Sequence, residues 1–377
     1  MPVYLDYAAT TPLEPLVLAA MLPALQGDYG NPASLHRVGQ QSRRLVETAR
    51  EQLAKAIAAE PRELTFTSGA TEADNHALRA YASRFPGGHI VTSRLEHAAV
   101  LTTCRQLEAE GWRVTYLEPD LRGEITADAV AAALRPDTCL VALMLVNNET
   151  GVVSNIPAIS RAVHEVGAAL FCDAVQGFGV MELNVETLGA DMLALSAHKV
   201  YGPKGVGALW RRRGLELPPF ILGGEQERGL RAGTLNVAGI VGMGRAAALV
   251  TERLEADALA IARLRDRLEA QLLANDGVTL NAAGAPRSAK HLNVRVEGVD
   301  GEDLLMGLDA AGVYVSAGSA CAAGTLEPSH VLLAMGLSKP QAKASIRLSL
   351  GRGLTDAMID EAAAAFAEVV ARCRSDI

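Results

Sequence analysis

The sequence has few aromatic residues, no long apolar run and no excess of basic charge. Aromatic residues make up 4% of the 377 residues, whereas hydrophobic residues reach 49%, which is typical of a globular α/β protein built on aliphatic residues and alanine. The longest apolar run, residues 139–146, is far too short to span a bilayer. The net charge of -8 argues against a nucleic-acid-binding protein.

Cysteine is also scarce, and its spacing excludes the usual zinc and dithiol motifs. No Cys-x-x-Cys pair occurs, so we expect no metal site. Residues 1–7 lack the basic leader and apolar core of a signal peptide, and reduced thiols fit a cytoplasmic protein. The five cysteines are Cys104, Cys139, Cys172, Cys321 and Cys373.

The chain is too long for one ordinary core, so we expect two domains. Between residues 60 and 210, short apolar runs alternate with helical patterns, which predicts a mainly parallel sheet with helices on both faces. Ligands bind at the carboxyl ends of strands in such sheets. The predicted strands are 63–67, 89–93, 113–117, 139–146, 169–173, 191–196 and 207–210. The predicted helices are 72–83, 97–110, 127–134 and 156–166.

An amphipathic pattern over about 249–275 predicts a long connecting helix. After it the pattern predicts a smaller α+β domain. Its expected strands are 278–281, 291–296, 314–316 and 345–350, and its expected helices are 302–311, 328–335 and 355–372. We therefore assign residues 15–255 to a large domain and residues 1–14 and 256–377 to a small one.

Lys199 follows the predicted strand 191–196, beside His198 and before the glycine-rich segment 201–207. Burial disfavours the ammonium form of a lysine and frees the amine as a nucleophile. A free amine can form a Schiff base with an aldehyde cofactor such as pyridoxal phosphate. On this segment alone, a surface lysine at a strand end is the alternative.

Other strands also end in polar residues that suit such a cofactor. A buried Asp173 needs a partner, which a pyridinium nitrogen would supply, and Gln176 could bond the phenolic oxygen. His97 could stack on the ring and shuttle protons, and Asn148 could hold a cofactor oxygen. The alternatives are helix capping for Asp173 and His97 and turn formation for Asn148.

Three segments suit anions. Residues 67–72 follow a strand and open a helix, where small residues let backbone N–H groups approach a phosphate, and Thr71 adds a hydroxyl. The alternative is that Thr71 or Ser68 simply caps the helix. Residues 229–234 form a glycine-rich loop with a cation and a hydroxyl. Arg347, at an apolar strand position, needs either a substrate carboxylate or a structural ion partner.

Cys321 lies within residues 316–325, which are otherwise all small. Such a segment has little side chain to anchor it, so we expect a mobile loop whose thiol travels between two places. A tightly packed turn with an inert thiol is the alternative.

Together and in this order, these segments resemble the cysteine desulfurases, which are fold-type I pyridoxal phosphate enzymes of the class V aminotransferase superfamily. The resemblance runs nearly end to end. It includes residues 4–12, 30–36, 68–72, 96–97, 146–149, 173–176, 196–205 and 231–234 and the loop around Cys321.

The resemblance implies a role for each candidate residue. Lys199 would hold the cofactor as a Schiff base, and Asp173, Gln176 and His97 would contact its ring. Asn148 and Arg347 would bind the substrate, with Arg347 on its carboxylate. The phosphate ligands would be Ala70, Thr71, Ser196 and His198.

The resemblance also implies a homodimer, because the family threonine that matches Thr234 reaches the cofactor phosphate of the other subunit. The implied reaction converts L-cysteine to L-alanine. Lys199 would remove the α-proton, Cys321 as a thiolate would attack the substrate sulfur and become a persulfide, and His97 would donate or accept protons. Because only the thiolate attacks, the pKa of Cys321 should be lowered in the occupied site.

Residues 318–321 and 326–329 match the family members that have the longer, mobile cysteine loop, although residues 322–324 replace the threonine or serine that often follows the cysteine. This loop type implies direct delivery of sulfur to an acceptor protein, such as an iron–sulfur scaffold or a tRNA-thiolation protein.

Two alternative functions use the same fold. An aminotransferase or a selenocysteine lyase would keep Lys199 and Asp173 without needing Cys321. A non-catalytic binding subunit would keep only the fold, and the joint presence of Lys199, His97, Asp173 and Cys321 argues against it.

Overall fold

The computed structural model describes residues 2–317 and 327–375. Its largest sheet has seven strands in the order β2-β8-β7-β6-β5-β3-β4. Only β8 runs antiparallel to its neighbours, so the predicted mainly parallel sheet of seven strands is confirmed. The strands are β2 (Leu64–Thr67), β3 (His89–Ser93), β4 (Arg113–Leu117), β5 (Thr138–Met144), β6 (Ala169–Asp173), β7 (Met192–Ser196) and β8 (Gly207–Arg211).

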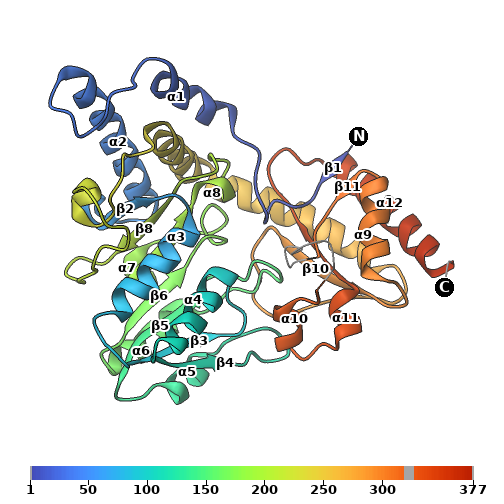
Figure 1. The fold of residues 1–377 in the computed structure, drawn as a ribbon. Helices are drawn as coiled ribbons and strands as arrows, with labels where there is room; N and C mark the ends of the chain where they lie inside the picture. The colour runs from blue at the N-terminus through green and yellow to red at the C-terminus, as the bar shows by residue number, and fades with distance from the viewer. Residues whose placement is uncertain (1, 318–326, 376–377) are drawn as a thin grey trace.

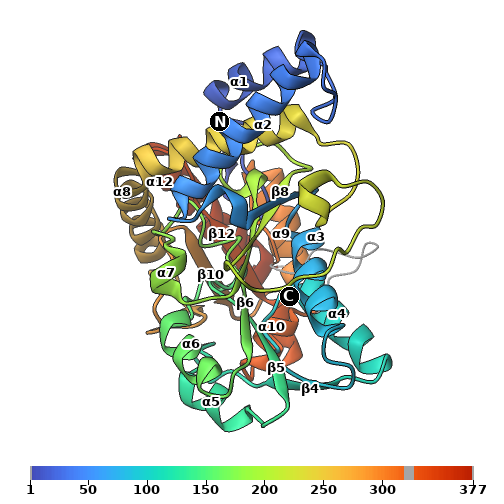
Figure 2. The same cartoon turned by 90° about the vertical axis from the view of Figure 1, so that its left-hand side faces the viewer.

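Helices cover both faces of this sheet, as Figure 2 shows with α5, α6 and α7 on one side and α3 and α4 on the other. The helix expected over 72–83 starts earlier, at Ala70, and continues as a π-helical segment, His76–Ala80. The helices of this part are α1 (Pro15–Gln26), α2 (Arg37–Ala56), α3 (Ala70–Asn75), α4 (Ala98–Ala109), α5 (Ala127–Ala133), α6 (Ile156–Glu165) and α7 (Val185–Leu188).

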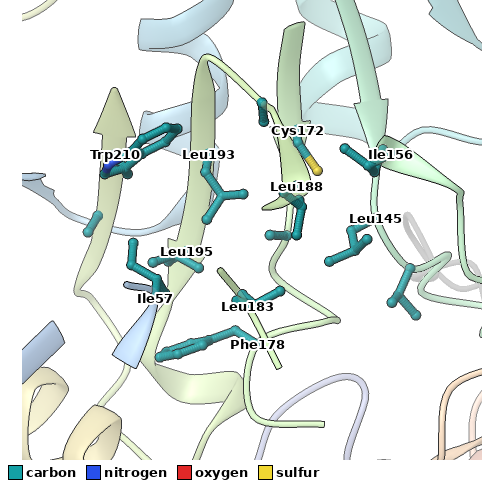
Figure 3. Packing of buried hydrophobic residues seen from close by; sticks show 14 of the residues in the cluster. Ile57, Leu145, Ile156, Cys172, Phe178, Leu183, Leu188, Leu193, Leu195 and Trp210 are labelled. Carbon is teal, nitrogen blue, oxygen red and sulfur yellow. The ribbon is translucent and has the colours of Figure 1, made fainter. Parts of the chain in front are cut away.

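The central strands are apolar on both faces because each face meets its own hydrophobic cluster. On β7, Leu193 and Leu195 pack in one cluster, while Met192 and Ala194 pack in the other. Figure 3 shows Leu193, Leu195 and Cys172 within the first cluster. Successive strand residues point to opposite faces, so a strand buried on both sides is apolar throughout. This is why β6 and β7 appear in the sequence as continuous apolar runs.

A long helix, α8 (Val237–Leu273), joins this sheet to the rest of the chain (Figure 1). It begins well before the predicted residue 249, because the Asn236 side chain accepts a hydrogen bond from the Gly239 N–H and caps it there. The first turns are rich in glycine and alanine, which conceals their helical period. Buried residues up to Val250 pack with the large sheet, whereas those from Ile261 onward pack in a separate cluster. The change from one cluster to the other falls between Val250 and Ile261.

The second cluster is built on an antiparallel sheet in the order β12-β10-β9 and on a two-stranded parallel pair, β1 with β11. The strands are β1 (Val3–Tyr4), β9 (Val278–Leu280), β10 (His291–Val296), β11 (Val313–Tyr314) and β12 (Ser345–Ser349). The helices are α9 (Gly301–Ala310), α10 (His330–Ala334), α11 (Lys339–Lys343) and α12 (Asp356–Ser375). No helix in residues 2–317 or 327–375 is both long and apolar enough to cross a membrane.

The N-terminal segment connects the two parts of the molecule. Asp6 forms a bridge with Ser349 at the end of β12. The Ala8 N–H donates to Ser349 Oγ at 2.8 Å, and the chain then continues to Thr11, whose hydroxyl donates to the His198 carbonyl at 2.9 Å. Residues 6–11 therefore run from the small sheet to the end of β7.

Candidate active site

The candidate residues of the large sheet meet at one edge. Strands β2, β3, β5, β6 and β7 all run in the same direction, because β8 is antiparallel to both β2 and β7. Their carboxyl ends therefore lie along the same edge. The residues at or just after these ends are Ala70, Thr71, His97, Asn148, Asp173, Gln176, Ser196, His198 and Lys199.

Lys199 closes the short 3₁₀ helix Ala197–Lys199 that follows β7. Its Nζ donates to the carbonyls of Ala8 and Ala9 at 2.6 and 2.7 Å. Burial, followed by the nearby Arg347 guanidinium, lowers the pKa of Lys199 to about 8, although Asp173 and Asp6 oppose the shift. Lys199 is thus not an ordinary surface lysine, and its amine is available as a nucleophile near neutral pH.

Asp173 is buried at the end of β6, where its Oδ1 accepts from the Val175 N–H at 3.0 Å. This contact is a turn and not the helix cap considered from the sequence, since no helix follows directly. Burial raises the pKa of Asp173, whereas the Val175 N–H, His97 and Lys199 lower it. A cation at its carboxylate would offset the cost of burying this charge.

Gln176 donates from Nε2 to the Ala8 carbonyl at 2.9 Å, the same oxygen that Lys199 contacts. Its buried Oε1 has no hydrogen-bond partner within the described residues. A carboxylate in need of a cation, an amide with an unused hydrogen-bonding atom and a lysine amine of lowered pKa therefore lie together. This set fits the pyridine nitrogen, phenolic oxygen and aldehyde of pyridoxal phosphate.

Two further buried carboxyl groups interact electrostatically with Asp173, and sequence reasoning assigned no role to either. Glu96 accepts from Ser93 Oγ at 2.6 Å, and burial raises its pKa to about 8. Burial also raises the pKa of Asp74, with Asp173 and Glu96 adding to the shift. Burial thus favours the protonated forms of Asp74 and Glu96, whereas the Asp173 carboxylate is favoured by His97 and Lys199.

His97 caps α4, as its sequence alternative proposed, because its Nδ1 accepts from the Ala99 N–H at 3.1 Å. That hydrogen bond places the proton of the neutral ring on Nε2. Desolvation lowers the pKa of His97, with Lys199 adding to the shift and Asp173 opposing it. The residue is otherwise exposed. Capping thus orients the imidazole and leaves the rest of the ring uncovered.

The segment after β2 is shaped by close backbone packing and not by a capping side chain. Gly69 is the N-cap of α3 and no side chain caps the helix, so the alternative role for Thr71 or Ser68 is wrong. A Cβ on Gly207 would lie 2.7 Å from the Gly69 carbonyl carbon, so only glycine allows this approach. Gly207 also pairs with Ser196, which brings Ser196 to the vicinity of Ala70 and Thr71.

Arg347 brings the small sheet into the site. It donates from Nη2 to Asp6 Oδ1 at 2.7 Å and from Nη1 to the Asn148 carbonyl at 2.9 Å. The structural ion pair considered from the sequence is therefore present, with Asp6 as the partner that the sequence did not indicate.

The turn after β5 is held by Asn147, whose Oδ1 accepts from the Glu149 and Thr150 N–H groups. Turn formation therefore falls to Asn147 and not to Asn148.

The glycine-rich loop around residues 229–234 is fixed by two ion pairs. Arg231 pairs with Glu72 at 2.9 Å, and the buried Glu227 pairs with Arg50 at 2.7 Å. The cation of this loop is therefore already neutralised by a carboxylate of its own chain. Thr234 is exposed.

The predicted catalytic Cys321 lies outside the described residues. Cys104, Cys139 and Cys172 are buried, and burial raises the pKa of each thiol, to about 12 for Cys104. Since the thiolate is the nucleophilic form, these three cysteines are poor nucleophiles.

Comparison with known proteins shows the family of this chain. The family model described as aminotransferase class-V matches residues 3–361. The cysteine desulfurase IscS of Anaeromyxobacter dehalogenans is 47% identical over 380 residues, which cover 99% of this chain and 94% of the relative. A solved NifS-like protein superposes with a TM-score of 0.93 at 35% identity, covering 99% of this chain and 100% of that one. SspA, solved in complex with cysteine, has a TM-score of 0.83 at 37% identity, covering 93% and 99% of the two chains.

The similarity extends over almost the whole length of both the sequence and the fold. The chain thus belongs to the class V aminotransferase family and, within it, to the cysteine desulfurases, which depend on pyridoxal phosphate.

Proposed function

We propose that the Cys321 thiol of this chain reacts with L-cysteine to give L-alanine and a Cys321 persulfide, whose outer sulfur then passes to an acceptor protein. The observation that carries the proposal is the meeting of the Lys199 amine, of lowered pKa, with Asp173 and Arg347 at one sheet edge. The cysteine bound in the related SspA supports L-cysteine as the substrate.

The residues at the strand ends would hold pyridoxal phosphate. Lys199 would bind its aldehyde carbon, Asp173 its pyridine nitrogen and Gln176 its phenolic oxygen, while His97 and Asn148 would flank its ring. When bound, the group supplies an electron sink for the bonds broken at the substrate α and β carbons. Its phosphate ligands would be Ala70, Thr71, Ser196 and His198.

Each remaining step falls to side chains of the protein. Arg347 and Asn148 would bind the substrate and fix its α-carboxylate. The Lys199 amine would take the α-proton, because its lowered pKa leaves much of it unprotonated near pH 8. His97, neutral at pH 7 with its proton on Nε2, is the second group able to transfer a proton.

Sulfur transfer would use Cys321 as the nucleophile. Its thiolate would attack the substrate sulfur, so that a sulfur–sulfur bond forms and the bond between the substrate Cβ and sulfur breaks. The electron pair of the broken bond stays with the carbon, which takes up a proton to become the methyl group of alanine. The raised pKa values of Cys104, Cys139 and Cys172 support Cys321 as the attacking thiol.

The proposal is tested by incubating the cofactor-loaded protein with L-cysteine and measuring alanine together with the mass of the Cys321 peptide. We expect one alanine and one added sulfur per active site before reductant is supplied. Cys321→Ala should abolish both, whereas Cys373→Ser, at a half-buried cysteine remote from the site in sequence, should preserve both. Full activity in Cys321→Ala would instead support another enzyme of this fold.

We further propose that the active unit is a homodimer in which Thr234 of each subunit reaches the cofactor phosphate of the other. The exposed leucines of α1, Leu16, Leu18, Leu22 and Leu25, provide an apolar surface suited to burial in an interface. Mixing Lys199→Ala and Thr234→Asp subunits tests this arrangement. Each homodimer should be inactive, and the mixture should regain activity, because a heterodimer holds one intact site. No recovery would mean that each site is complete within one subunit.

The acceptor is proposed to be an iron–sulfur scaffold or a tRNA-thiolation protein, reached in the cytoplasm, on the basis of the cysteine-loop sequence at residues 318–329. Transfer of radioactive sulfur from the Cys321 persulfide to purified candidates would identify it. Retention of the label on the enzyme with every candidate of both classes would contradict the proposal.

A further inference from the structure

Lys290, the residue before β10, is a buried cation that the proposed reaction does not use. Its side chain is 3% exposed, and its Nζ has no hydrogen-bond partner within residues 2–317 and 327–375. An unpaired buried ammonium is unfavourable, so lysines are rarely fully buried without a partner. A lysine in this position therefore indicates an anion that binds there.

The backbone places Lys290 beside the substrate residues of the small sheet. The Lys290 carbonyl accepts from the Leu350 N–H at 2.9 Å, just beyond the end of β12. The next residue, His291, pairs with Ser349 and packs against Gly151, in the turn that follows Asn148. Lys290 thus lies between the end of β12, which carries Arg347, and the turn after β5.

The charges near Lys290 are also positive. Burial, followed by the nearby cations Lys199 and Arg347, lowers the pKa of Lys290 to about 7. His291 and His198, the other titratable groups that interact with Lys290, also have lowered pKa values and are neutral at pH 7. The Asp6 carboxylate already accepts a hydrogen bond from Arg347.

A second donor nearby is unused. Arg347 donates from both terminal nitrogens, but its Nε is buried and has no partner among the described residues. Unpaired buried donors are uncommon in folded proteins. Lys290, just before β10, and Arg347, within the neighbouring β12, are therefore two cationic side chains with N–H donors that no described residue uses, which suits a ligand with two acceptor oxygens.

We propose that Lys290 and the Nε of Arg347 together bind the α-carboxylate of the amino-acid substrate. The inference rests on the proposed function and adds a second cation to the carboxylate subsite. In an α-amino acid only one carbon separates the carboxylate from the amine, so a subsite beside Lys199 suits such a ligand. The substrate, and not a protein side chain, then neutralises Lys290.

The proposal is tested by equilibrium binding of L-alanine and ethylamine, which differ only by the carboxylate, followed through the absorbance of the bound cofactor. Wild-type protein should prefer L-alanine. Lys290→Met should weaken L-alanine binding about 10- to 100-fold, the value of one charged hydrogen bond, and change ethylamine binding less than about twofold. Lys290→Arg should retain part of the preference. Lys55→Met, at an exposed lysine on α2, is the matched control and should behave as wild type.

An unchanged preference in Lys290→Met overturns the proposal. So does a loss of pyridoxal phosphate affinity with the preference intact, which would assign Lys290 to the phosphate. The melting temperatures of cofactor-free wild-type protein and Lys290→Met distinguish a structural role of Lys290 from a role in ligand binding. If Lys290 only binds the ligand, losing its unpartnered charge should not lower the melting temperature. If Lys290→Met does not fold, Lys290→Gln serves in the same titrations. Failure of the proposed function is distinct: wild-type protein would then release no sulfur from cysteine.

Discussion

The two sheets that form the site use buried polar residues in opposite ways. In the large sheet, β6 and β7 are apolar until their last residues, Asp173 and Ser196. In the small sheet, Asn293 and Arg347 lie opposite each other in the middle of β10 and β12. Both kinds of strand are buried, so the difference does not lie in exposure.

The difference lies in what covers each face. The large sheet has hydrophobic clusters on both faces, and the polar side chains of β6 and β7 lie where these strands end. The small sheet has a hydrophobic cluster on the face of Leu292, Val294 and Ile346. Its opposite face meets polar groups of other segments, as the contacts of Arg347 with the Asn148 carbonyl and the Asp6 carboxylate show. Strand ends thus position the residues proposed to bind the cofactor, and a strand face positions Arg347, which is proposed to bind the substrate.

The largest effect should follow from changing the strand-end lysine. Lys199→Ala removes the only amine proposed to bind the cofactor and to take the α-proton, so we expect alanine formation to fall by at least about 10³-fold. The absorbance band of the lysine-bound cofactor should also be lost. Lys204→Ala, at an exposed lysine of the following loop, should retain both. A covalently attached cofactor in Lys199→Ala would refute the assignment.

A core residue of the large sheet should affect stability more than a polar residue of the small one. Phe171 is fully buried on β6, so Phe171→Ala should lower the free energy of unfolding by about 3–5 kcal/mol through the cavity it leaves. Denaturant unfolding of the cofactor-free protein measures this change.

Asn293→Ala tests the same contrast on the small sheet. Asn293 accepts from Asn281 and donates to the Glu149 carbonyl at 2.7 and 3.2 Å. Its loss leaves buried polar groups unpaired, which should cost about 1–3 kcal/mol. Equal losses in Phe171→Ala and Asn293→Ala would abolish the distinction between an apolar and a polar sheet face.

The pH dependence of cofactor attachment should reveal the influence of the small sheet on the large one. Only the unprotonated Lys199 amine attacks the aldehyde, so the rate of loading should rise with pH and level off above about 8, instead of near the ordinary 10.5, because the pKa is lowered. Arg347→Met removes a cation that lowers this pKa, so its midpoint should move upward. Stopped-flow absorbance measures both midpoints, and identical values would show that Arg347 does not act on Lys199.

The last effect appears only as a change of stability with pH and concerns Asp74, a buried carboxyl group on α3. Its pKa is raised by burial, so the folded protein holds a proton that the unfolded chain releases above pH 4. Wild-type stability should therefore lose up to about 1.4 kcal/mol per pH unit above pH 4 through this group, until pH reaches the folded pKa. Asp74→Asn should lack this loss and become relatively more stable as pH rises from 4 to 7. A constant difference would show that Asp74 is ionised.

Much of the fold followed from apolar runs and their ends. Strands β3, β4, β6 and β10 have the predicted bounds, because each is a short apolar or alternating run that stops at a polar or turn residue. Parallel strands place such ends at a common edge, so the grouping of Asp173 with Lys199 was predictable as well. The ionisation of Asp74 and Glu96 was not, since it depends on burial next to Asp173.

The sequence by itself determined which residue types end the strands and hence the chemistry available at the sheet edge, because hydrophobic period and turn residues act over a few positions. Only the tertiary structure decided which distant groups share that edge. Asp6 pairs with Arg347 across 341 positions, and cations of two other segments lower the pKa of Lys290. Such contacts depend on the pairing of residues 5–7 with β12 and on the packing of two sheets, and no local pattern in the chain encodes these distances.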